Sequence, residues 1–395
     1  MTELNRPRVA HLTTTDMSLD WLLGPQLKAF QRAGYDVVGM SSPGPHVAAI
    51  EVGGIRHVAV HALSRAPSVL QDVRALFELR KVLKHERVDI LHTHNPKPGV
   101  LGRIVGRALR IPVVVNTQHG LYAQPTDQRR RRWPVYALER IAAACSHAEL
   151  VQNPEDAQTL IKTLHISSKR VTVLGNGVDL SRFDPAAVPA ADRQAMRRQW
   201  GCSDDDVVCI VVGRLVAEKG LPEIFEAAET LQLERSSARF VVVGPADLDK
   251  TDAIDRAWVQ RAERAGVVFV GERSDMPECY AAADIFVTAS HREGFPRAAM
   301  EAGAMGLAIV ATDIRGCRQV VSDGLNGVLA EVRNPASLTA AIRNLVSDRH
   351  RREKMMMNAR PHALAHFDQQ RVIDITLETY ARLLARKSPV AVRTS

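Results

Sequence analysis

Short apolar runs alternate with amphipathic stretches along the whole chain. In the first half the apolar runs predict strands at 9–12, 35–40, 55–60, 89–92, 113–117 and 171–174, and in the second half at 207–213, 240–244, 267–271, 285–289 and 308–312. The runs are apolar at consecutive positions, which is typical of parallel strands buried on both faces. Helical patterns lie between them, so the chain predicts doubly wound α/β architecture.

The strand–helix series is interrupted once, by the irregular stretch "GNGVDLSRFDPAAVPAADRQ". We therefore expect two Rossmann-like domains, 1–178 and 179–368, joined by a linker near 175–205. Within 369–395 we expect a final helix that crosses back to the first domain, followed by a frayed tail. Two such domains would face each other across a cleft lined by the carboxyl ends of their strands.

The net charge of +8 is unevenly distributed along the sequence. Residues 1–178 hold 23 Lys and Arg against 14 Asp and Glu, a net of +9, whereas residues 179–395 hold 29 against 30, a net of −1. A basic first half favours an anionic partner such as a membrane surface, a phosphorylated acceptor or nucleic acid. A solvated basic face without a partner is the alternative.

The cysteines and the lack of long apolar runs predict a location. The five cysteines form no Cys-x-x-Cys pair and no zinc-ligand spacing with histidine, which indicates a reducing compartment. The N-terminus resembles no signal peptide, and no apolar run approaches the roughly 18 residues of a membrane span. We expect a cytoplasmic protein whose contact with a membrane, if any, is peripheral.

The loop "GRLVAEKG" follows the first strand of the second half and brings two cations to the carboxyl end of that strand. Arg214 offers a planar fork of donors and Lys219 a point charge, a suitable pair for a diphosphate. A helix is expected to begin near Pro222. Ordinary surface cations would give the same local pattern.

The stretch "SHREGFPRAAMEAGAMG" follows a strand and opens a helix of small residues. With Pro296 at the first helical position, the backbone N–H groups of 294–297 would form an anion site at the helix N-terminus. Glu301 inside the helix can accept hydrogen bonds from paired ribose hydroxyls, and Glu293 before it can bind another polyol. The alternative is that Glu301 pairs with a neighbouring loop inside the core.

These blocks resemble a known family. "EGFPRAAMEAGAMG" is similar to the E-x7-E signature of glycosyltransferase family 4, the retaining enzymes of GT-B fold. "VVGRLVAEKG", "GNGVD", "YAAADIFVTAS" and "VATDIRGCRQVVSDGLNGVLA" match further blocks in the expected order. The resemblance implies a retaining transfer of a hexose or N-acetylhexosamine from a nucleotide sugar, with UDP favoured as the nucleotide.

The resemblance also assigns roles to residues of the donor site. Arg214 and Lys219 would hold the donor diphosphate, Glu301 the ribose, and Glu293 the transferred sugar near its C3 hydroxyl. Backbone groups of Gly294, Phe295, Pro296 and Arg297 would contact phosphate and sugar. His119, after the strand at 113–117, would reach the donor sugar from the acceptor side; a loop histidine bonded to backbone is the alternative.

Two blocks depart from the family pattern. The loop after the first strand, "LTTTDMSLDWLL", lacks the Gly-Gly pair of many relatives, so Ser18 is expected to supply a hydrogen-bond donor instead. Gln319 stands where a glutamate is common.

No metal is expected. The cations and the helix N-terminus point to where the leaving diphosphate gains charge. "SDDDVV" at 203–208 precedes a strand and predicts a solvated turn, not a metal motif. Apart from the nucleotide-sugar co-substrate we expect no cofactor.

Two stretches of the first half concern the acceptor. Lys97 is expected in a loop after the strand at 89–92. "QRRRRWPVYALERIAAA" predicts a basic amphipathic helix that contacts a membrane or another anion through Arg129, Arg130, Arg131, Arg132 and Trp133. A solvated charge run is the alternative. The blocks resemble family members that build capsule, exopolysaccharide or glycolipid precursors, which implies a lipid-linked or other glycan acceptor at the inner face of the plasma membrane.

Other functions remain to be distinguished. A nucleotide-sugar epimerase or a glycan phosphorylase would share the fold, and the basic first half is compatible with nucleic-acid binding. Against the latter, aromatic residues make up only 5% of the chain, and no RNP, helix-turn-helix or zinc motif is present. We expect no nucleic-acid partner.

Overall fold

A computed structural model describes residues 6–64, 66, 68–94, 96–125, 127–247 and 250–387. The chain forms two compact units. Unit 1 comprises the residues up to Gly175 together with those from Gln370 onward, and unit 2 comprises Asn176–Gln369. The expected tail lies outside the described residues.

Unit 1 is built on a seven-stranded, entirely parallel sheet of order β3-β2-β1-β4-β5-β6-β7. Its strands are β1 (Arg8–Thr15), β2 (Asp36–Ser42), β3 (Arg56–Ala59), β4 (Ile90–His94), β5 (Val113–Gln118), β6 (Ala148–Val151) and β7 (Val171–Val173). Its α-helices are α1 (Gly24–Arg32), α2 (Val47–Val52), α3 (Val69–Glu86), α4 (Lys97–Ala108), α5 (Arg129–Ala144), α6 (Pro154–Gln158) and α14 (Gln369–Lys387). Unit 1 also has two π-helical turns, Ser18–Leu22 and Thr159–Thr163, and a 3-10 turn, Ser168–Arg170.

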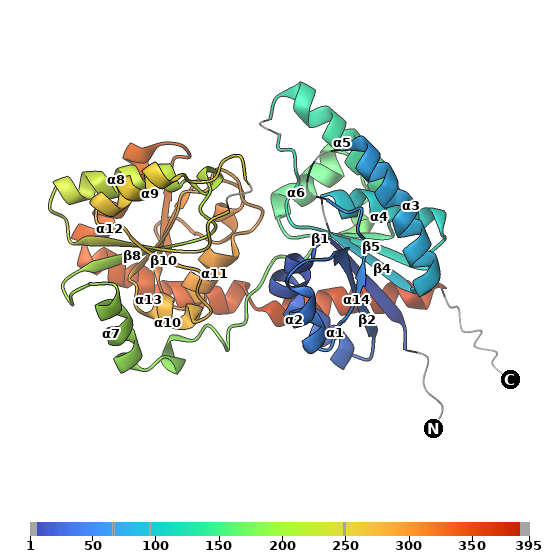
Figure 1. Cartoon of the computed structure of the whole chain (residues 1–395), viewed down its shortest axis with the longest axis horizontal. Coiled ribbons are helices and arrows are strands. Elements are labelled where there is room, and N and C mark those ends of the chain that lie inside the picture. The colour runs from blue at the N-terminus through green and yellow to red at the C-terminus, as the bar shows by residue number, and fades with distance from the viewer. Residues whose placement is uncertain are drawn as a thin grey trace. The chain divides into compact units, whose positions relative to one another are not determined.

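Helices cover both faces of this sheet (Figure 1). α1, α2 and α14 pack with one face in a single apolar cluster, and α3 and α4 pack with the other. Gly102 lets α4 approach the sheet, because a Cβ at this position would lie 2.6 Å from Cγ2 of Thr93. The tight contact explains a small residue in the middle of α4.

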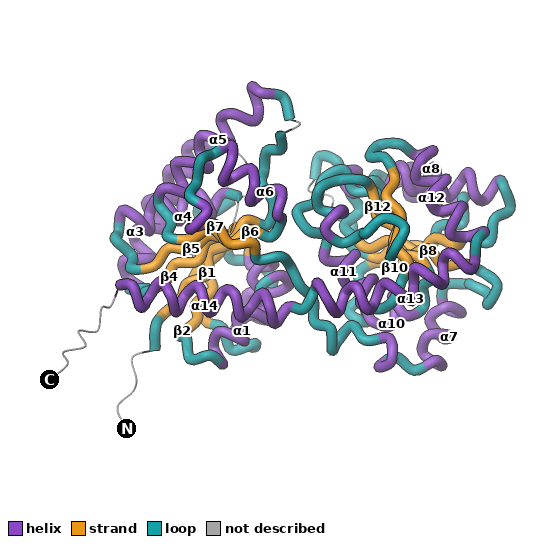
Figure 2. The backbone as a smooth tube through the Cα atoms, turned by 180° about the vertical axis from the view of Figure 1, so that it is seen from behind, coloured by secondary structure: helices purple, strands orange, loops and turns teal. Residues whose placement is uncertain are grey.

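Unit 2 repeats the plan with a six-stranded parallel sheet of order β10-β9-β8-β11-β12-β13. The strands are β8 (Val207–Val212), β9 (Ala238–Val243), β10 (Val268–Gly271), β11 (Ile285–Thr288), β12 (Ala308–Thr312) and β13 (Gly327–Ala330). The α-helices are α7 (Ala190–Gln199), α8 (Leu221–Leu233), α9 (Arg256–Arg264), α10 (Met276–Ala281), α11 (Arg297–Ala304), α12 (Pro335–Ser347) and α13 (Arg349–His366). α8, α9 and α12 cover one face and α7, α10 and α11 the other. Figure 2 shows α8 and α12 on one side of the strands and α7 and α10 on the other.

The structure confirms every strand that the apolar runs predict and adds two, β6 and β13. β6 escapes the pattern because Glu149 interrupts its apolar run. The buried Arg103 compensates that carboxylate at 2.9 Å. β13 has the short run "GVLA", which begins with a glycine whose Cβ would lie 2.2 Å from the carbonyl oxygen of Ile309.

The prediction of a linker near 175–205 is wrong. Residues from Asn176 belong to unit 2, where α7 packs into the core. Arg197 of α7 pairs with Asp284 at 3.1 Å and donates to the carbonyl oxygens of Ser203 and Asp206. The prolines that gave this stretch an irregular appearance lie before α7, at Pro185 and Pro189.

The final helix is confirmed as α14, and its apolar residues join the core of unit 1. All five cysteines are free thiols. Among the described residues, none of the helices has both the length and the apolar character that spanning a bilayer requires.

Candidate functional site

Each sheet has one position where the strand order reverses, and ligands of such folds bind outside the carboxyl ends of the strands there. In unit 2 this position lies between β8 and β11. Arg214 and Lys219 follow β8, and Glu293 follows β11, so three predicted site residues lie at one edge of the sheet. In unit 1 the reversal lies between β1 and β4.

Lys219 and Glu293 form a direct ion pair, with side chains 29% and 18% exposed. Ser290 Oγ donates to Glu293 Oε1 at 3.1 Å, and Thr312 Oγ1 donates to the carbonyl oxygen of Ser290 at 2.6 Å. Gly316 packs against the same loop, because a Cβ there would lie 2.6 Å from the carbonyl oxygen of Glu293. The carboxylate is thus held from several sides, while its cationic partner stays partly open to solvent.

Arg214 forms a second ion pair, with Asp247, and its side chain is 34% exposed. The loop that carries Arg214 and Lys219 turns at Gly220, which has a left-handed φ of 71°. A Cβ on Gly220 would lie 2.0 Å from the carbonyl oxygen of Ala289, so only glycine allows the loop to approach β11 so closely. α8 then begins at Leu221, which confirms the predicted start near Pro222.

α11 begins one residue later than predicted. Pro296 is the N-cap, with an extended ψ of 107°, and Arg297 is the first helical residue. The prediction of Pro296 as the first helical residue is therefore wrong, although the proline still precedes the helix directly. Phe295 packs edge-on against Phe367, with ring centroids 6.0 Å apart. This contact holds the loop that leads into α11, in which Gly294 precedes Phe295.

Glu301 satisfies its carboxylate within the protein. Tyr280 Oη donates to Oε2 at 3.1 Å, and Arg297 Nε donates to Oε1 at 3.0 Å from the preceding helical turn. Burial raises the pKa of Glu301, and the neighbouring guanidinium opposes that shift. Burial also raises the pKa of the Tyr280 hydroxyl well above its usual value, so it donates throughout the physiological range. Glu301 keeps 13% of its side chain exposed, so a ligand can still reach it.

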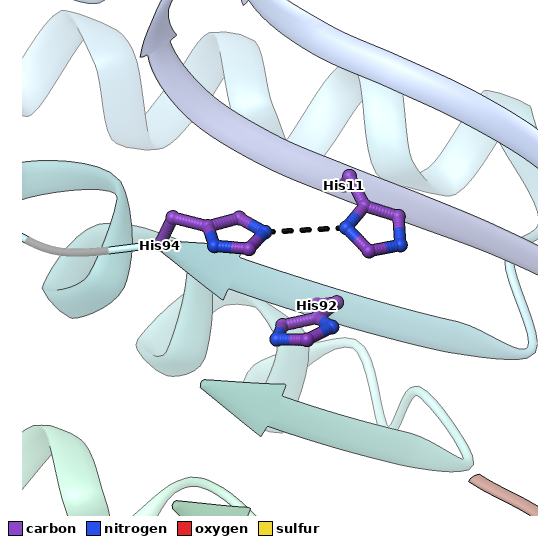
Figure 3. A group of neighbouring side chains, drawn as sticks. All are labelled: His11, His92 and His94. Atoms are coloured by element: carbon purple, nitrogen blue, oxygen red, sulfur yellow. Dashed lines mark hydrogen bonds between the residues drawn. The ribbon is translucent and has the colours of Figure 1, made fainter. Parts of the chain in front are cut away.

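In unit 1, His119 belongs to a cluster that sequence reasoning missed. Its Nε2 lies 2.9 Å from His94 Nδ1, and His94 Nε2 lies 3.2 Å from His11 Nδ1 (Figure 3). His11 Nε2 lies 3.3 Å from the hydroxyl of Tyr380 in α14. The same hydroxyl contacts His92 Nδ1, and His92 Nε2 lies 2.7 Å from Thr117 Oγ1. We call these five residues, His11, His92, His94, His119 and Tyr380, the histidine cluster.

Burial keeps the imidazoles of the histidine cluster neutral. It lowers the pKa of His11 to about 3 and that of His119 to about 4, and Gln152 opposes the shift of His119 slightly. The pKa values of His92 and His94 also fall well below the usual value, because of burial and of the neighbouring imidazoles. Three of these residues, His11, His92 and His94, offer nitrogen atoms within 4.8 Å of one another, the only grouping of metal-ligand type among the described residues.

Ser18 and Lys97 lie at the carboxyl ends of β1 and β4 respectively. Ser18 begins a π-helical turn, and its Oγ lies 3.3 Å from Thr15 Oγ1. The prediction that Lys97 lies in a loop is wrong, because Lys97 is the first residue of α4. Its ammonium pairs with Asp72 at 2.7 Å and donates to the carbonyl oxygen of Ala66.

The arginine run opens α5, as the amphipathic pattern predicts. Arg129, Arg130 and Arg131 are exposed. Arg132 instead lies over the rings of Trp133 and Tyr136, at 6.0 and 5.8 Å from their centroids. Three apolar side chains on the same helix are exposed, namely Trp133 at 51%, Leu138 at 48% and Ile141 at 58%. We call these three residues the α5 stripe.

The acidic part of the stretch "SDDDVV", residues 203–206, forms the predicted turn directly before β8, and its two valines begin that strand. Asp206 accepts hydrogen bonds from the backbone and hydroxyl of Ser203, each at 2.8 Å. Asp204 and Asp205 are exposed.

Several residues that pair with the predicted site residues could not be identified from the local sequence. Asp247 and Tyr380 meet their partners only through the fold, since they are 33 and 288 residues away from Arg214 and His92. Arg297 and Glu301 could have been paired from their i, i+4 spacing. His92 and His94 alternate in "HTH", which places both on one face of a strand, so that pair was also visible in the sequence.

Two family models match this chain and together span most of it. The model described as "Glycosyl transferases group 1" matches residues 192–362, and the model described as "Glycosyltransferase Family 4" matches residues 26–182. The matched segments correspond to the bulk of unit 2 and of unit 1 respectively.

Two relatives are similar over most of their length. An Escherichia coli protein named UDP-Gal:alpha-D-GlcNAc-diphosphoundecaprenol alpha-1,3-galactosyltransferase is 30% identical over 84% of this chain and 85% of its own. A Campylobacter jejuni protein named N,N'-diacetylbacillosaminyl-diphospho-undecaprenol alpha-1,3-N-acetylgalactosaminyltransferase is 27% identical over 83% of this chain and 86% of its own.

Among solved structures, HepE of Anabaena in complex with UDP superimposes with a TM-score of 0.78 at 20% identity, over 95% of this chain and 100% of that one. At this identity the likeness concerns the fold alone. It confirms the predicted fold class, two parallel-sheet α/β domains of the GT-B type.

Proposed function

Because its two halves match the group 1 and Family 4 models, this chain belongs to the glycosyltransferases, and we propose that it is a retaining enzyme. The proposed reaction transfers a hexose or N-acetylhexosamine from a UDP-sugar to a lipid-linked glycan acceptor. The family membership makes transfer, and not epimerisation or phosphorolysis, the reaction class. The observation that carries the donor part is the pairing of Lys219 with Glu293 beside Arg214, at the strand-order reversal of unit 2.

In the proposed donor site, unit 2 holds the nucleotide and the departing diphosphate. Arg214 and Lys219 lie on the loop after β8, and both keep about a third of their side chains exposed. Arg214 is paired with Asp247 and Lys219 with Glu293, and we propose that the donor diphosphate replaces these carboxylates as the partner of each cation. Negative charge grows on the diphosphate as the glycosidic bond breaks, and fixed cations there lower the barrier.

The two glutamates take different proposed parts. Glu301 is held by Tyr280 and Arg297 in a fixed orientation, which suits a ligand with two adjacent hydroxyls such as ribose. Glu293 lies at the loop before α11, and once Lys219 turns to phosphate, its carboxylate is available to a hydroxyl of the transferred sugar. Retention follows if the acceptor attacks the face that the leaving group vacates. His119 of unit 1 is proposed to contact the donor sugar.

A UDP-sugar is favoured by the similar proteins. The E. coli relative is named for UDP-Gal, and the solved structure of HepE contains UDP. The acceptor class has the same kind of support, since both named relatives act on sugars linked to undecaprenyl diphosphate. We extend these two features to this chain. The nucleotide sugar is a substrate, and no further cofactor or metal is included in the proposal.

Contact with an anionic membrane is proposed through α5. The α5 stripe exposes two aliphatic side chains and one indole on one helix, and three exposed arginines lie at the start of that helix. This combination suits the interface of a membrane with anionic lipids, where each basic residue near the surface contributes about 1 kcal/mol. Such contact would place the enzyme where lipid-linked acceptors reside, at the inner face of the plasma membrane.

The central experiment combines donor and acceptor. The purified full chain is incubated with UDP-Gal, UDP-GalNAc, UDP-Glc or UDP-GlcNAc and with GlcNAc linked to undecaprenyl diphosphate. The product is identified by mass, and its anomeric configuration by NMR. We expect one donor to give an α-linked product. A β-linked product would refute retention, and transfer only to soluble oligosaccharides would refute the lipid acceptor.

A binding experiment isolates the donor class. UDP at 100 times its dissociation constant should raise the free energy of unfolding by about 2.7 kcal/mol, which a thermal shift detects. GDP and ADP are the matched controls. A larger shift with GDP would overturn the choice of UDP, and tight salt-dependent binding of duplex DNA without any nucleotide effect would favour the nucleic-acid alternative.

Membrane contact is tested with vesicles of phosphatidylglycerol and phosphatidylcholine. Replacing Trp133, Leu138 and Ile141 by serine should abolish sedimentation with the vesicles while leaving transfer to a short-chain acceptor intact. The matched control replaces Leu233, which is 84% exposed in unit 2. Equal sedimentation of both variants would contradict the assignment to α5.

A further inference from the structure

The histidine cluster is a continuous chain of hydrogen bonds that begins just after β5 and ends in β5. It starts at His119, passes through His94, His11, Tyr380 and His92, and closes at Thr117 Oγ1. Three strands and α14 contribute to it, and every member except His119 is at most 4% exposed. Apart from His119, no member of this hydrogen-bonded cluster takes part in the proposed transfer reaction.

The protonation of one member determines that of the next. Each imidazole is neutral at pH 7, so it has one N–H donor and one lone pair that accepts. If His94 Nδ1 donates to His119, then His94 Nε2 must accept from His11 Nδ1. His11 Nε2 then accepts from Tyr380, whose oxygen accepts from His92 Nδ1. The opposite direction requires the proton on Nε2 of all four residues.

We propose that His94, His11, Tyr380 and His92 act as positioning residues that lock the four histidines into one shared tautomer and thereby fix whether Nδ1 of His119 donates or accepts. The proposal rests on the proposed role of His119 at the donor sugar. It explains what the hydrogen-bonded chain of side chains is for. A nitrogen that only donates, or only accepts, can form only one kind of hydrogen bond with a hydroxyl or phosphate oxygen. A lone loop histidine would exchange between both tautomers.

The same contacts argue against a metal at His11, His92 and His94. All six of their ring nitrogens lie within hydrogen-bonding distance of another member of the chain or of Thr117. The rings of His92 and His94 are also stacked, with centroids 4.6 Å apart and planes 16° from parallel. Ligand lone pairs lie in the ring plane, so stacked rings do not converge on one ion. Figure 3 shows His92 lying beside the contact that joins His11 to His94.

The direct test is NMR of the full chain with ¹⁵N-labelled histidine, in which two-bond correlations distinguish Nδ1–H from Nε2–H. Single His→Gln variants assign the signals. We expect His11, His92, His94 and His119 to be neutral and to share one tautomer at pH 7. Mixed tautomers within the cluster would overturn the proposal, and so would one tightly bound zinc per chain found by elemental analysis.

Tyr380→Phe tests the link itself, because it removes only the hydroxyl that joins His11 to His92. We expect kcat to fall about 3- to 10-fold, the size of one lost hydrogen bond, while KM for the nucleotide sugar stays within twofold. The NMR spectrum should then show His92 no longer constrained to the tautomer of His94. Tyr35→Phe is the matched control, since the Tyr35 ring packs against Tyr380 at 5.7 Å but its hydroxyl lies outside the chain.

A second pair of variants covers the case that Tyr380→Phe fails to fold. At position 94, glutamine can still donate on one side and accept on the other, whereas leucine can do neither. Activity retained by His94→Gln and lost by His94→Leu, at equal melting temperature, supports the chain; equal activity in the two overturns it. If His119→Ala is fully active while the shared tautomer is observed, the proposed role of His119 fails and the tautomer lock stands.

Discussion

The two units carry similar sheets but arrange their polar groups in opposite ways. Unit 1 holds neutral imidazoles that satisfy one another through the histidine cluster. Unit 2 holds ion pairs, Lys219 with Glu293 and Arg214 with Asp247, whose side chains are partly exposed. A ligand can exchange with the charged pairs at little cost, because a phosphate replaces a carboxylate. The neutral histidine cluster has no charge to offer a phosphate in exchange for its own hydrogen bonds. It is therefore better suited to orient one residue, His119.

The comparison also corrects the impression given by net charge. Residues 1–178 have a net charge of +9 and residues 179–395 a net of −1, yet the clustered cations that suit a diphosphate lie in the second part. The exposed arginines of the first part lie instead on α5. The net charge therefore pointed to the basic surface of α5 in unit 1, whereas the motifs pointed to the candidate donor site in unit 2.

The largest expected effect is the acid sensitivity of unit 1. The pKa of His11 is lowered to about 3 and that of His119 to about 4, whereas both titrate near 6.5 when unfolded. The unfolded chain therefore binds more protons below pH 6.5, and each imidazole removes about 1.4 kcal/mol of unfolding free energy per pH unit between about 6.5 and 4. Stability is thus full above pH 6.5 and falls as the pH falls.

Hydrogen exchange measured by mass spectrometry at pH 7, 6 and 5, after correction for the intrinsic exchange rate, checks this expectation unit by unit. Peptides of β1, β4 and β5 should lose protection, while those of β8 and β11 serve as the internal control. Equal changes in the two units would remove the contrast between them.

Loss of one cation in unit 2 is expected to have the next largest effect. Arg214→Ala and Lys219→Ala should each lower kcat about 100- to 1000-fold, or about 2.7–4 kcal/mol, because the charge acts where the leaving diphosphate becomes more negative. Their melting temperatures should change little, since both side chains are partly exposed. Arg239→Ala is the matched control, because the Arg239 side chain is also partly exposed, at 47%, and is paired with Asp206. Rates within a few-fold of the unmodified enzyme would remove both cations from the site.

The two glutamates sharpen the comparison within unit 2. Glu301→Gln should weaken binding of free UDP by about 1.5–3 kcal/mol, because it removes a charge-assisted hydrogen bond to ribose. Glu293→Gln should lower turnover while leaving UDP affinity equal or higher, since it also frees Lys219 from its carboxylate. Calorimetry with UDP, beside steady-state rates, separates these roles. Equal losses of UDP affinity in both variants would refute the division.

The smallest expected effect is that of metal removal. Treatment with EDTA should leave transfer activity unchanged, because cationic side chains take the charge of the leaving group and the ring nitrogens of His11, His92 and His94 already have hydrogen-bond partners within the histidine cluster or at Thr117. Activity lost with EDTA and restored by manganese would contradict both arguments. Activity restored by zinc alone would direct attention to unit 1.

The sequence allowed much of the fold to be predicted, because buried parallel strands are apolar at consecutive positions. β6 escaped since its Glu149 is compensated by Arg103, 46 positions away in sequence. The local motifs located Arg214, Lys219 and Glu293 in loops after strands, and Glu301 in the helix that follows. Their roles toward ligands stay predictions, because their contacts in the structure are with other side chains of the protein.

What the sequence could not supply were partners that only the fold brings together. Asp247 lies on the loop after β9 and Tyr280 in α10, yet they bind Arg214 and Glu301. The loop predicted at Lys97 is the first turn of α4, which tolerates the flanking Pro96 and Pro98 because proline fits the start of a helix. The chain through Tyr380 required the last helix, whose position against β1 and β4 no local pattern specifies.

The way α14 joins unit 1 has a consequence for the order of synthesis. Unit 1 is discontinuous, with the whole of unit 2 inserted between Gly175 and Gln370. A ribosome therefore releases all seven strands of unit 1 long before Val372, Ile373 and Tyr380 exist to cover one face of their sheet. Unit 2 is continuous and can fold while it is being translated, but unit 1 stays open until the end. The enzyme thus completes its first half last, and a stop codon near residue 369 would spare unit 2 while leaving unit 1 without its final layer.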